Sequence, residues 1–197
     1  MASATNGPAY RFAFHKKGTG TLTLTGGNTY KADTAVDGGT LKLASGASLP
    51  ATGISVADGA TLNLNGASQA AERLEGAGTV TNGTVAVADA VLPGGEGTVG
   101  TLTLEGASLT SGALVVDVGA NGTCDRLVST GTLDLSNLSL ALGESAVLDE
   151  TKVYTIATAA EVTGRFADVV VPKKWRVTAH PTSVTLAYAN GSVLVFR

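Results

Sequence analysis

Leucine and threonine alternate in a short phrase that returns along the chain. In the first copy, Gly20-Thr-Leu-Thr-Leu24, the leucines fall on one side of an extended chain and the threonines on the other, because successive strand side chains point to opposite faces. The pattern predicts a half-buried strand with a threonine-rich outer face.

The spacing of the copies indicates stacked repeats. Complete or weaker copies start at residues 20, 39, 59, 78, 100 and 131, which are 19, 20, 19, 22 and 31 residues apart. A period of about 20 residues is typical of solenoids, in which each repeat buries its apolar face against the next. Leucine-rich repeats share this period, but their Leu-x-x-Leu-x-Leu-x-x-Asn pattern is absent. The sequence therefore predicts an all-β fold, a parallel β-helix whose stacked coils align Leu22, Leu41, Leu62, Leu102 and Leu133.

Three regions follow from the repeats. Residues 1–17 are predicted to form an N-terminal strand or cap, residues 18–150 the β-helix repeats, and residues 151–197 C-terminal coils with an antiparallel cap. Alternation in the last region predicts strands at Val153–Ile156, Val169–Val171, Trp175–Ala179, Ser183–Ala187 and Ser192–Phe196.

Both ends carry local signals. Tyr10, Phe12 and Phe14 alternate with polar or small residues as in a strand, and Lys16 and Lys17 are interpreted as solvated turn residues.

At the other end, Asn190-Gly191 is a hairpin signal that would pair Tyr188 with Val193. Trp175, the single tryptophan, is expected to cover the end of the core, with sugar stacking as the functional alternative.

Two Asp-Gly pairs have a structural and a functional interpretation. Asp37 and Asp58 each precede a glycine, and both residue types tolerate the left-handed backbone angles of tight turns. Calcium binding is the alternative, but the Gly-Gly-x-Gly-x-Asp nonapeptide of calcium-binding β-rolls is absent. We therefore expect turns here and assign no metal ligand.

Few residues suit catalysis. Cys124, the single cysteine, would need a histidine base as a nucleophile, and the chain has only His15 and His180. We interpret this cysteine as a partly buried bystander.

The nearest approach to an acidic cluster is Asp117, Asp125 and Asp134, with Arg126 as a possible base. Because Asp125 and Arg126 are adjacent, a strand would point them to opposite sides. No catalytic, cofactor-binding or metal-binding residue is assigned.

Composition narrows the choice of partners. The 197 residues include 26 glycines, with 15% charged and 5% aromatic residues and a net charge of -3. A low, slightly acidic charge gives no reason to expect nucleic-acid binding. There is no run of 18 apolar residues for a membrane-spanning helix. The first residues lack the charged-then-apolar order of a signal peptide.

The order of the phrases resembles the passenger domains of bacterial autotransporters and their associated β-strand repeat. The resemblance covers about residues 18–188, and the segments that carry it are residues 18–30, 36–43, 74–80, 92–102, 112–117, 124–133, 153–156, 164–166 and 184–186. It implies a right-handed single-stranded parallel β-helix, a pectin-lyase-like solenoid, in a secreted or surface-displayed, outer-membrane-associated bacterial protein.

The expected function is a non-catalytic structural stalk or adhesin-type segment. The expected partners are host or environmental glycans, surface proteins and neighbouring coils of a longer chain, without a cofactor. The alternative is a polysaccharide-active, pectin-lyase-like enzyme or a carbohydrate-binding module, because such enzymes place several carboxylates in one groove of the same kind of coil.

Overall fold

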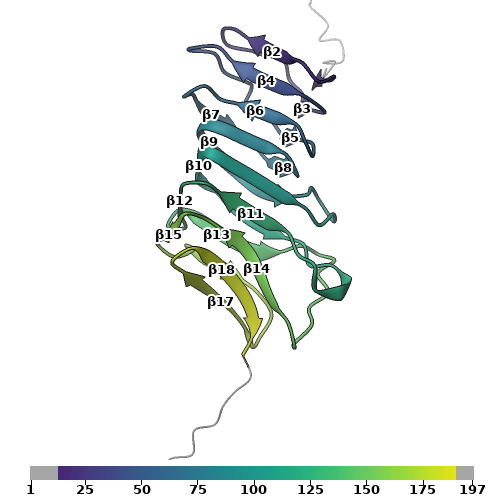
Figure 1. The fold of residues 1–197 in the computed structure, drawn as a ribbon, viewed down its shortest axis with the longest axis vertical. Helices are drawn as coiled ribbons and strands as arrows, with labels where there is room; N and C mark the ends of the chain where they lie inside the picture. Colours follow the sequence, from purple (N-terminus) through teal and green to yellow (C-terminus); the bar gives the residue numbers. More distant parts are fainter. Residues whose placement is uncertain (1–12, 190–197) are drawn as a thin grey trace, which may run out of the picture.

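The strands of the protein lie in a long stack. The computed structural model describes residues 13–189, which form a 16-stranded sheet and a 2-stranded sheet. Figure 1 shows the strands one below another along the long axis, from the N-terminal end to the C-terminal end. The sole helical segment among these residues is the 3-10 helix η1 (Ala120–Gly122). The predicted all-β class is confirmed.

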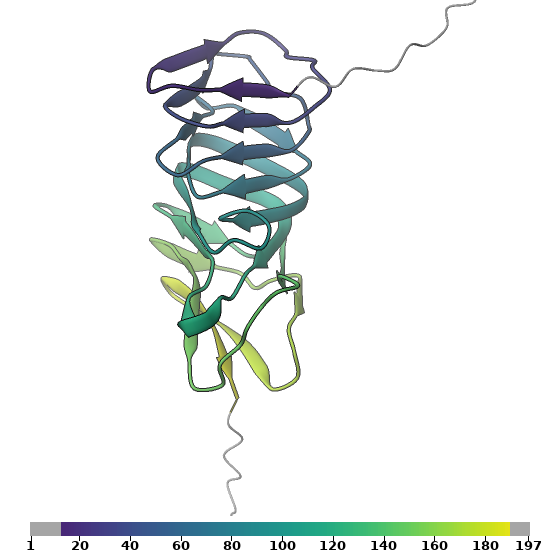
Figure 2. The ribbon, with the colours of Figure 1, turned by 90° about the vertical axis from the view of Figure 1, so that its right-hand side faces the viewer.

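A first row of parallel strands follows the repeat period. Phe14 lies opposite Thr34, and Thr34 lies opposite Ile54, so one position recurs every 20 residues. Figure 2 shows this row from the side. In order, its members are β1 (Phe14–Lys16), β3 (Thr34–Val36), β5 (Ile54–Val56), β8 (Leu74–Gly76), the ends of β9 (Thr79–Pro93) and β10 (Thr101–Val116), β13 (Leu138–Leu142) and β16 (Asp168–Val170).

A second row contains the repeated phrase. Its strands are parallel down to β14, and the last two pairs are antiparallel. In order, its members are β2 (Thr21–Leu24), β4 (Thr40–Leu43), β6 (Thr61–Asn63), the starts of β9 and β10, β11 (Arg126–Ser129), β14 (Val153–Thr158), β18 (Ser183–Tyr188) and β17 (Trp175–His180).

Two long strands join the rows through a third, shorter one. The third row contains β7 (Ser68–Ala71) and the middle of β9 and β10, while β12 (Thr132–Asp134) and β15 (Glu161–Thr163) form the small sheet. Strand β9 pairs in turn with β6, β7 and β8, so it follows the whole outline of the coil before it. Asn82 (φ 54°) and Gly106 (φ 59°) provide left-handed bends within β9 and β10.

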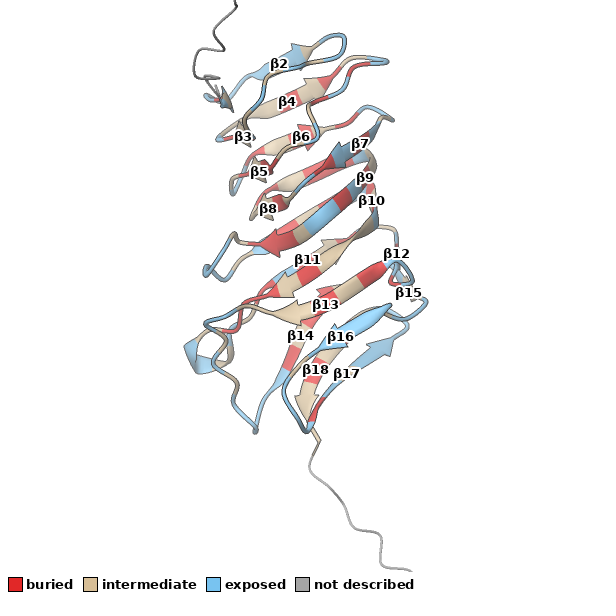
Figure 3. Ribbon diagram, turned by 180° about the vertical axis from the view of Figure 1, so that it is seen from behind, coloured by how far each residue is buried: buried red, intermediate tan, exposed pale blue. Residues whose placement is uncertain are grey.

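The apolar side chains of the rows meet inside the stack. They form one buried cluster that extends from Val36 to Leu186. Figure 3 shows buried positions alternating with half-buried or exposed ones along the strands, which is the expected result of a period of two residues.

The alignment of leucines is correct for the first coils. Leu22 lies opposite Leu41, and Leu41 lies opposite Leu62. The line then continues through Val80 and Leu104.

The prediction that Leu102 and Leu133 continue this line is wrong. Leu104 occupies the position expected for Leu102, and Leu133 pairs with Val162 in the small sheet. Paired positions 80 and 104 are 24 residues apart, whereas the glycines at 78 and 100 are 22 apart. The slip is two residues, which keeps side chains on the same face, and Leu102 is still fully buried.

Antiparallel strands complete the C-terminal end. Strand β18 has β14 on one side and β17 on the other, and Tyr188 pairs with Trp175. The predicted partner of Tyr188, Val193, lies outside the described residues, as does the Ser192–Phe196 strand. Both edges of β18 are already occupied, so Tyr188 is not part of the simple hairpin that we expected.

The N-terminal expectation is only partly visible. Phe14 belongs to β1, whereas Tyr10 and Phe12 lie outside the described residues. Within residues 13–189 there is no helix with the length and apolar character needed to cross a membrane.

Candidate functional site

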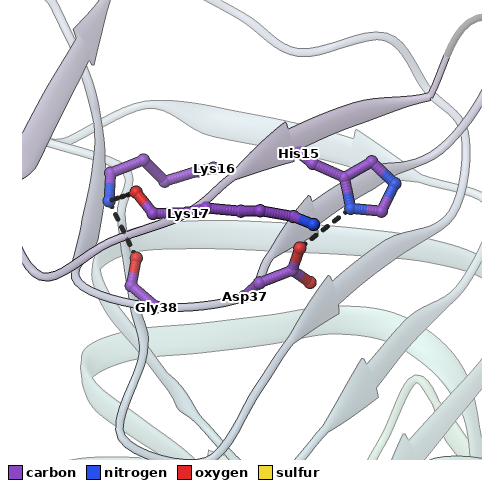
Figure 4. A network of polar contacts seen from close by, with 5 residues as sticks. All are labelled: His15, Lys16, Lys17, Asp37 and Gly38. Atoms are coloured by element: carbon purple, nitrogen blue, oxygen red, sulfur yellow. Dashed lines mark hydrogen bonds and ion pairs between the residues drawn. The ribbon is translucent and has the colours of Figure 1, made fainter.

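A buried lysine lies in the first coil. Lys16 is 5% exposed, and its ammonium donates hydrogen bonds to the carbonyls of Lys17, Gly18 and Gly38 at 2.9, 2.9 and 2.8 Å. Figure 4 shows the side chain of Lys16 directed at these carbonyls. The interpretation of Lys16 as a solvated turn residue is wrong, while Lys17 is exposed as expected. The reason is that Lys16 points inward from β1, and the turns above and below it leave carbonyls without ladder partners.

The Asp-Gly pairs are turns, as predicted. Gly59 after Asp58 and Gly39 near Asp37 have positive φ angles of 72° and 63°. The Asp37 Oδ2 also lies 2.9 Å from the Nδ1 of His15, across adjacent coils (Figure 4). This contact is polar and exposed.

Asp125 ties three chain segments together. Its Oδ1 accepts a hydrogen bond from the Gly100 N–H at 2.8 Å, and its Oδ2 accepts one from the Asp117 N–H at 2.9 Å. The Asp125 N–H donates to the Asp117 carbonyl at 2.8 Å. Burial raises the pKa of the Asp125 carboxyl to about 7; the two N–H donors oppose this rise, and the charge of Asp117 adds to it.

The predicted acidic cluster is reduced to two residues. Asp117 and Asp125 are adjacent and buried. Asp134 is exposed on β12 in the small sheet, where the Ser136 N–H donates to its Oδ1 and holds the pKa of that carboxyl below its usual value. Arg126 is exposed while Asp125 is buried, so these neighbours face opposite sides as predicted. Among residues 13–189, no three His, Cys, Asp or Glu side chains are close enough together to hold a metal ion as they stand.

Cys124 is half-buried. Its thiol donates a weak hydrogen bond to the Thr155 carbonyl at 3.6 Å. Burial raises the pKa of the thiol, which disfavours the nucleophilic thiolate. Of the two histidines, His15 contacts Asp37, and the Nε2 of His180 lies 3.1 Å from the Thr185 hydroxyl.

The largest hollow is an open groove of about 720 Å³ at the C-terminal end. It lies between β15, β16 and β17, and apolar side chains such as Phe166, Val169 and Val177 line it. Glu161, Arg165 and other polar groups share its lining. Sequence reasoning missed this groove, because its residues come from separate segments without a common motif.

Trp175 belongs to the core beside this groove. It is 5% exposed and packs against Tyr154 and Tyr188, with ring centroids 5.9 and 5.7 Å away. A ring buried to this extent offers no open face for a sugar. The prediction that Trp175 covers the end of the core is confirmed.

Comparison with known proteins adds a family to this geometry. Residues 14–43 match the family model described as passenger-associated-transport-repeat. The matched segment contains β1 to β4 and the first two copies of the repeated phrase. A search of curated proteins found no match. Residues 14–43 are therefore a repeat of the passenger-associated-transport-repeat family, and the predicted relation to autotransporter passenger repeats is confirmed.

Proposed function

We propose that the chain is a right-handed parallel β-helix that acts as a non-catalytic stalk or adhesin segment of a secreted or surface-displayed bacterial protein. The observation that carries this proposal is the register between coils, in which Leu22, Leu41 and Leu62 lie in one line. A single coil cannot bury its own leucines, so stacking supplies the core of a rod. The match of residues 14–43 to a passenger repeat supports an extracellular setting.

The exposed N-terminal edge supports continuation of the rod. Among the described residues, β1 pairs only with β3, and β2 only with β4. Leu22 in β2 is 40% exposed, whereas Leu41 in the next coil is fully buried. A further coil placed on this edge would cover Leu22 and pair the free strand groups. Neighbouring coils of a longer chain are therefore among the proposed partners.

The separation of candidate catalytic groups supports a non-catalytic role. Asp134 lies in a different sheet from the Asp117–Asp125 pair, and Arg126 faces away from Asp125. A polysaccharide-cleaving mechanism of the kind considered above needs its carboxylates or its base in one groove.

A carbohydrate-binding role has one specific observation in its favour. The C-terminal groove combines an apolar lining with Glu161, Arg165 and His180, and ligand sites are typically concave and apolar with a few polar groups. Glycan binding, if present, is proposed to use this groove rather than Trp175.

Incubation with immobilised plant, mucin and microbial polysaccharides tests these functions. Retention and released sugar are measured together, with the Arg165→Ala variant for the groove and Lys173→Ala as an exposed-charge control outside it. Retention lost in Arg165→Ala but kept in Lys173→Ala supports an adhesin that binds through the groove. Neither retention nor release supports a stalk, and released sugar contradicts the non-catalytic proposal.

A further inference from the structure

A second pocket, of about 350 Å³, collects acidic side chains from three separate segments. Asp117 follows β10, Glu96 belongs to the loop after β9, and Glu144 follows β13. Leu92 and Val115 contribute apolar surface to the same pocket. The three carboxylates therefore share one hollow although 21 and 27 residues separate them in sequence (117 − 96 and 144 − 117).

Asp117 is the buried member of this set. The residue is 7% exposed. Its backbone N–H and carbonyl are both bonded to Asp125. Among residues 13–189, no group donates a hydrogen bond to its carboxylate, although the carboxylate of the adjacent Asp125 accepts two.

Gly143 makes room for this carboxylate. A Cβ atom at Gly143 would lie 1.8 Å from the Asp117 Oδ1, which no side chain could tolerate. The Gly143 N–H is bonded to the Val116 carbonyl, so the glycine is held against the end of β10. The pocket thus has space for an acid whose charge no protein group balances.

An unbalanced buried carboxylate is costly, and a second carboxylate beside it adds repulsion. A bound cation would supply the missing opposite charge. Calcium accepts six to eight oxygen ligands in flexible geometry, including carboxylates, backbone carbonyls and water. Glu96 and Glu144 are exposed, so their side chains are free to turn toward the pocket.

We propose that this pocket binds a divalent cation of the calcium class, with Asp117 as the buried ligand and Glu96 and Glu144 closing on it from the rim. Binding would tie the loop of residues 94–100 and the turn of residues 143–145 to the end of β10. The acidic pairs at the Asp-Gly turns are not involved. The proposal does not depend on the stalk or adhesin function.

Thermal unfolding of the EDTA-treated, dialysed protein tests the proposal at equal ionic strength in 10 mM CaCl2, 10 mM MgCl2 or 1 mM EDTA. A site with the dissociation constant of extracellular calcium modules, on the order of 0.1 to 1 mM, should raise the Tm by about 3 to 10 °C in calcium. Magnesium should raise it less, because it demands near-ideal octahedral geometry. Isothermal titration with CaCl2 should show saturable binding with one ion per chain.

Three variants locate the site. Asp117→Asn should abolish the calcium response and, because it removes an unbalanced charge, should raise the Tm in EDTA. The Glu96→Gln/Glu144→Gln double variant leaves the buried residues intact and should weaken calcium binding at least tenfold. Asp58→Asn, at an exposed turn, is the matched control and should respond like the wild type.

The proposal is overturned by the absence of saturable calcium binding in the wild type up to 10 mM. It is also overturned if the double variant binds calcium as tightly as the wild type, which decides the question even where Asp117→Asn does not fold. Equal Tm shifts in calcium and magnesium that persist in the double variant would indicate general charge screening and contradict a built site.

Discussion

At the scale of single residues, the protein stabilises a buried cation with backbone carbonyls rather than with a carboxylate. The Lys16 ammonium has three N–H donors, and all three are used. Two of its acceptors, Lys17 and Gly18, belong to the turn that follows β1, and the third, Gly38, belongs to the turn of the next coil. One side chain thus fixes two stacked turns to each other.

Replacing this lysine should destabilise the first coils. Lys16→Met keeps the apolar stem but leaves three carbonyls without their charged donor, so we expect a loss of about 1 to 3 kcal/mol in the free energy of unfolding. Lys17→Met is the matched control, because the Lys17 side chain is exposed and its carbonyl is retained. Denaturant midpoints measure the difference, and equal midpoints for the two variants would show that the carbonyl contacts contribute nothing.

Asp125 should make stability depend on pH. Its folded pKa of about 7 is above the ordinary value of 3.8 because of burial. The folded state therefore holds this proton more tightly, so the contribution to stability is complete below about pH 4 and is lost as pH rises through about 7.

Thermal unfolding in EDTA between pH 4 and 8 checks this sign. The Tm of the wild type should fall relative to that of Asp125→Asn as pH rises, because the asparagine keeps the shape but cannot titrate. A constant difference between the two proteins, or a relative gain by the wild type, would contradict the raised pKa.

Sequence reasoning reached part of this polar chemistry. The opposite orientation of Asp125 and Arg126 followed from the two-residue period of a strand, which is a local rule. The burial of Lys16 could not be foreseen, because it depends on the Gly38 carbonyl of another coil. For the same reason, sequence proximity suggested Asp134 as a member of the acidic cluster, whereas the pairing of β12 with β15 moves it to a separate sheet.

At the scale of elements, the turn between β3 and β4 must pass very close to the coil before it. Gly39 has a left-handed φ of 63°, and an added Cβ would lie 2.5 Å from the carbonyl oxygens of Gly18 and Gly20. Gly59 has a similar φ of 72°, but an added Cβ would have nothing within 4 Å. The two glycines of the repeated phrase therefore have different reasons to be glycine.

Alanine at these two positions should separate backbone strain from close contact. Gly59→Ala should cost about 1 to 2 kcal/mol, the penalty of a left-handed conformation. Gly39→Ala carries the same penalty and must also displace backbone of the neighbouring coil, so it should cost more. Urea unfolding of both variants measures this order, and equal costs would mean that the coils separate easily at this turn.

Strand phrases that look alike should differ in energy according to their place in the stack. Leu102 is fully buried, whereas Leu22, in the same Gly-Thr-Leu phrase, is 40% exposed at the edge. Leu102→Ala should cost about 2 to 5 kcal/mol, and Leu102→Asp should cost more because it buries an unpaired charge. Leu22→Ala should cost clearly less than Leu102→Ala, and equal denaturant midpoints for these two variants would contradict the burial that the stack imposes.

The repeated phrase predicted where strands form better than which residues they pair. Strands β2, β4 and β6 follow its copies, and their leucines are in register. The register slips by two residues at β10 because the loop before Gly100 makes that coil longer. The full lengths of β9 and β10 were also missed, since their middle parts contain alanine, serine and threonine instead of a recurring leucine.

At the scale of the whole molecule, each strand depends on the coils directly above and below it. Strand β9 has the coil of β6, β7 and β8 on one side and β10 on the other. At the ends, β2 and β16 each pair with one strand of the described residues. In such a stack the stability is close to a sum over neighbouring interfaces, so the middle has two interfaces to lose and each end has one.

Hydrogen exchange measured by mass spectrometry should therefore show a gradient along the stack. Peptides from β9 and β10 should exchange most slowly, and peptides from β2 and β16 should exchange fastest, because the end strands can open without disturbing the middle. In Leu102→Ala, exchange should accelerate in β10 and β11, where Leu102 lies opposite Leu127. Equal protection of β2 and β9 in the wild type would instead mean that the stack opens only as one unit, and the one-dimensional description of its stability would be wrong.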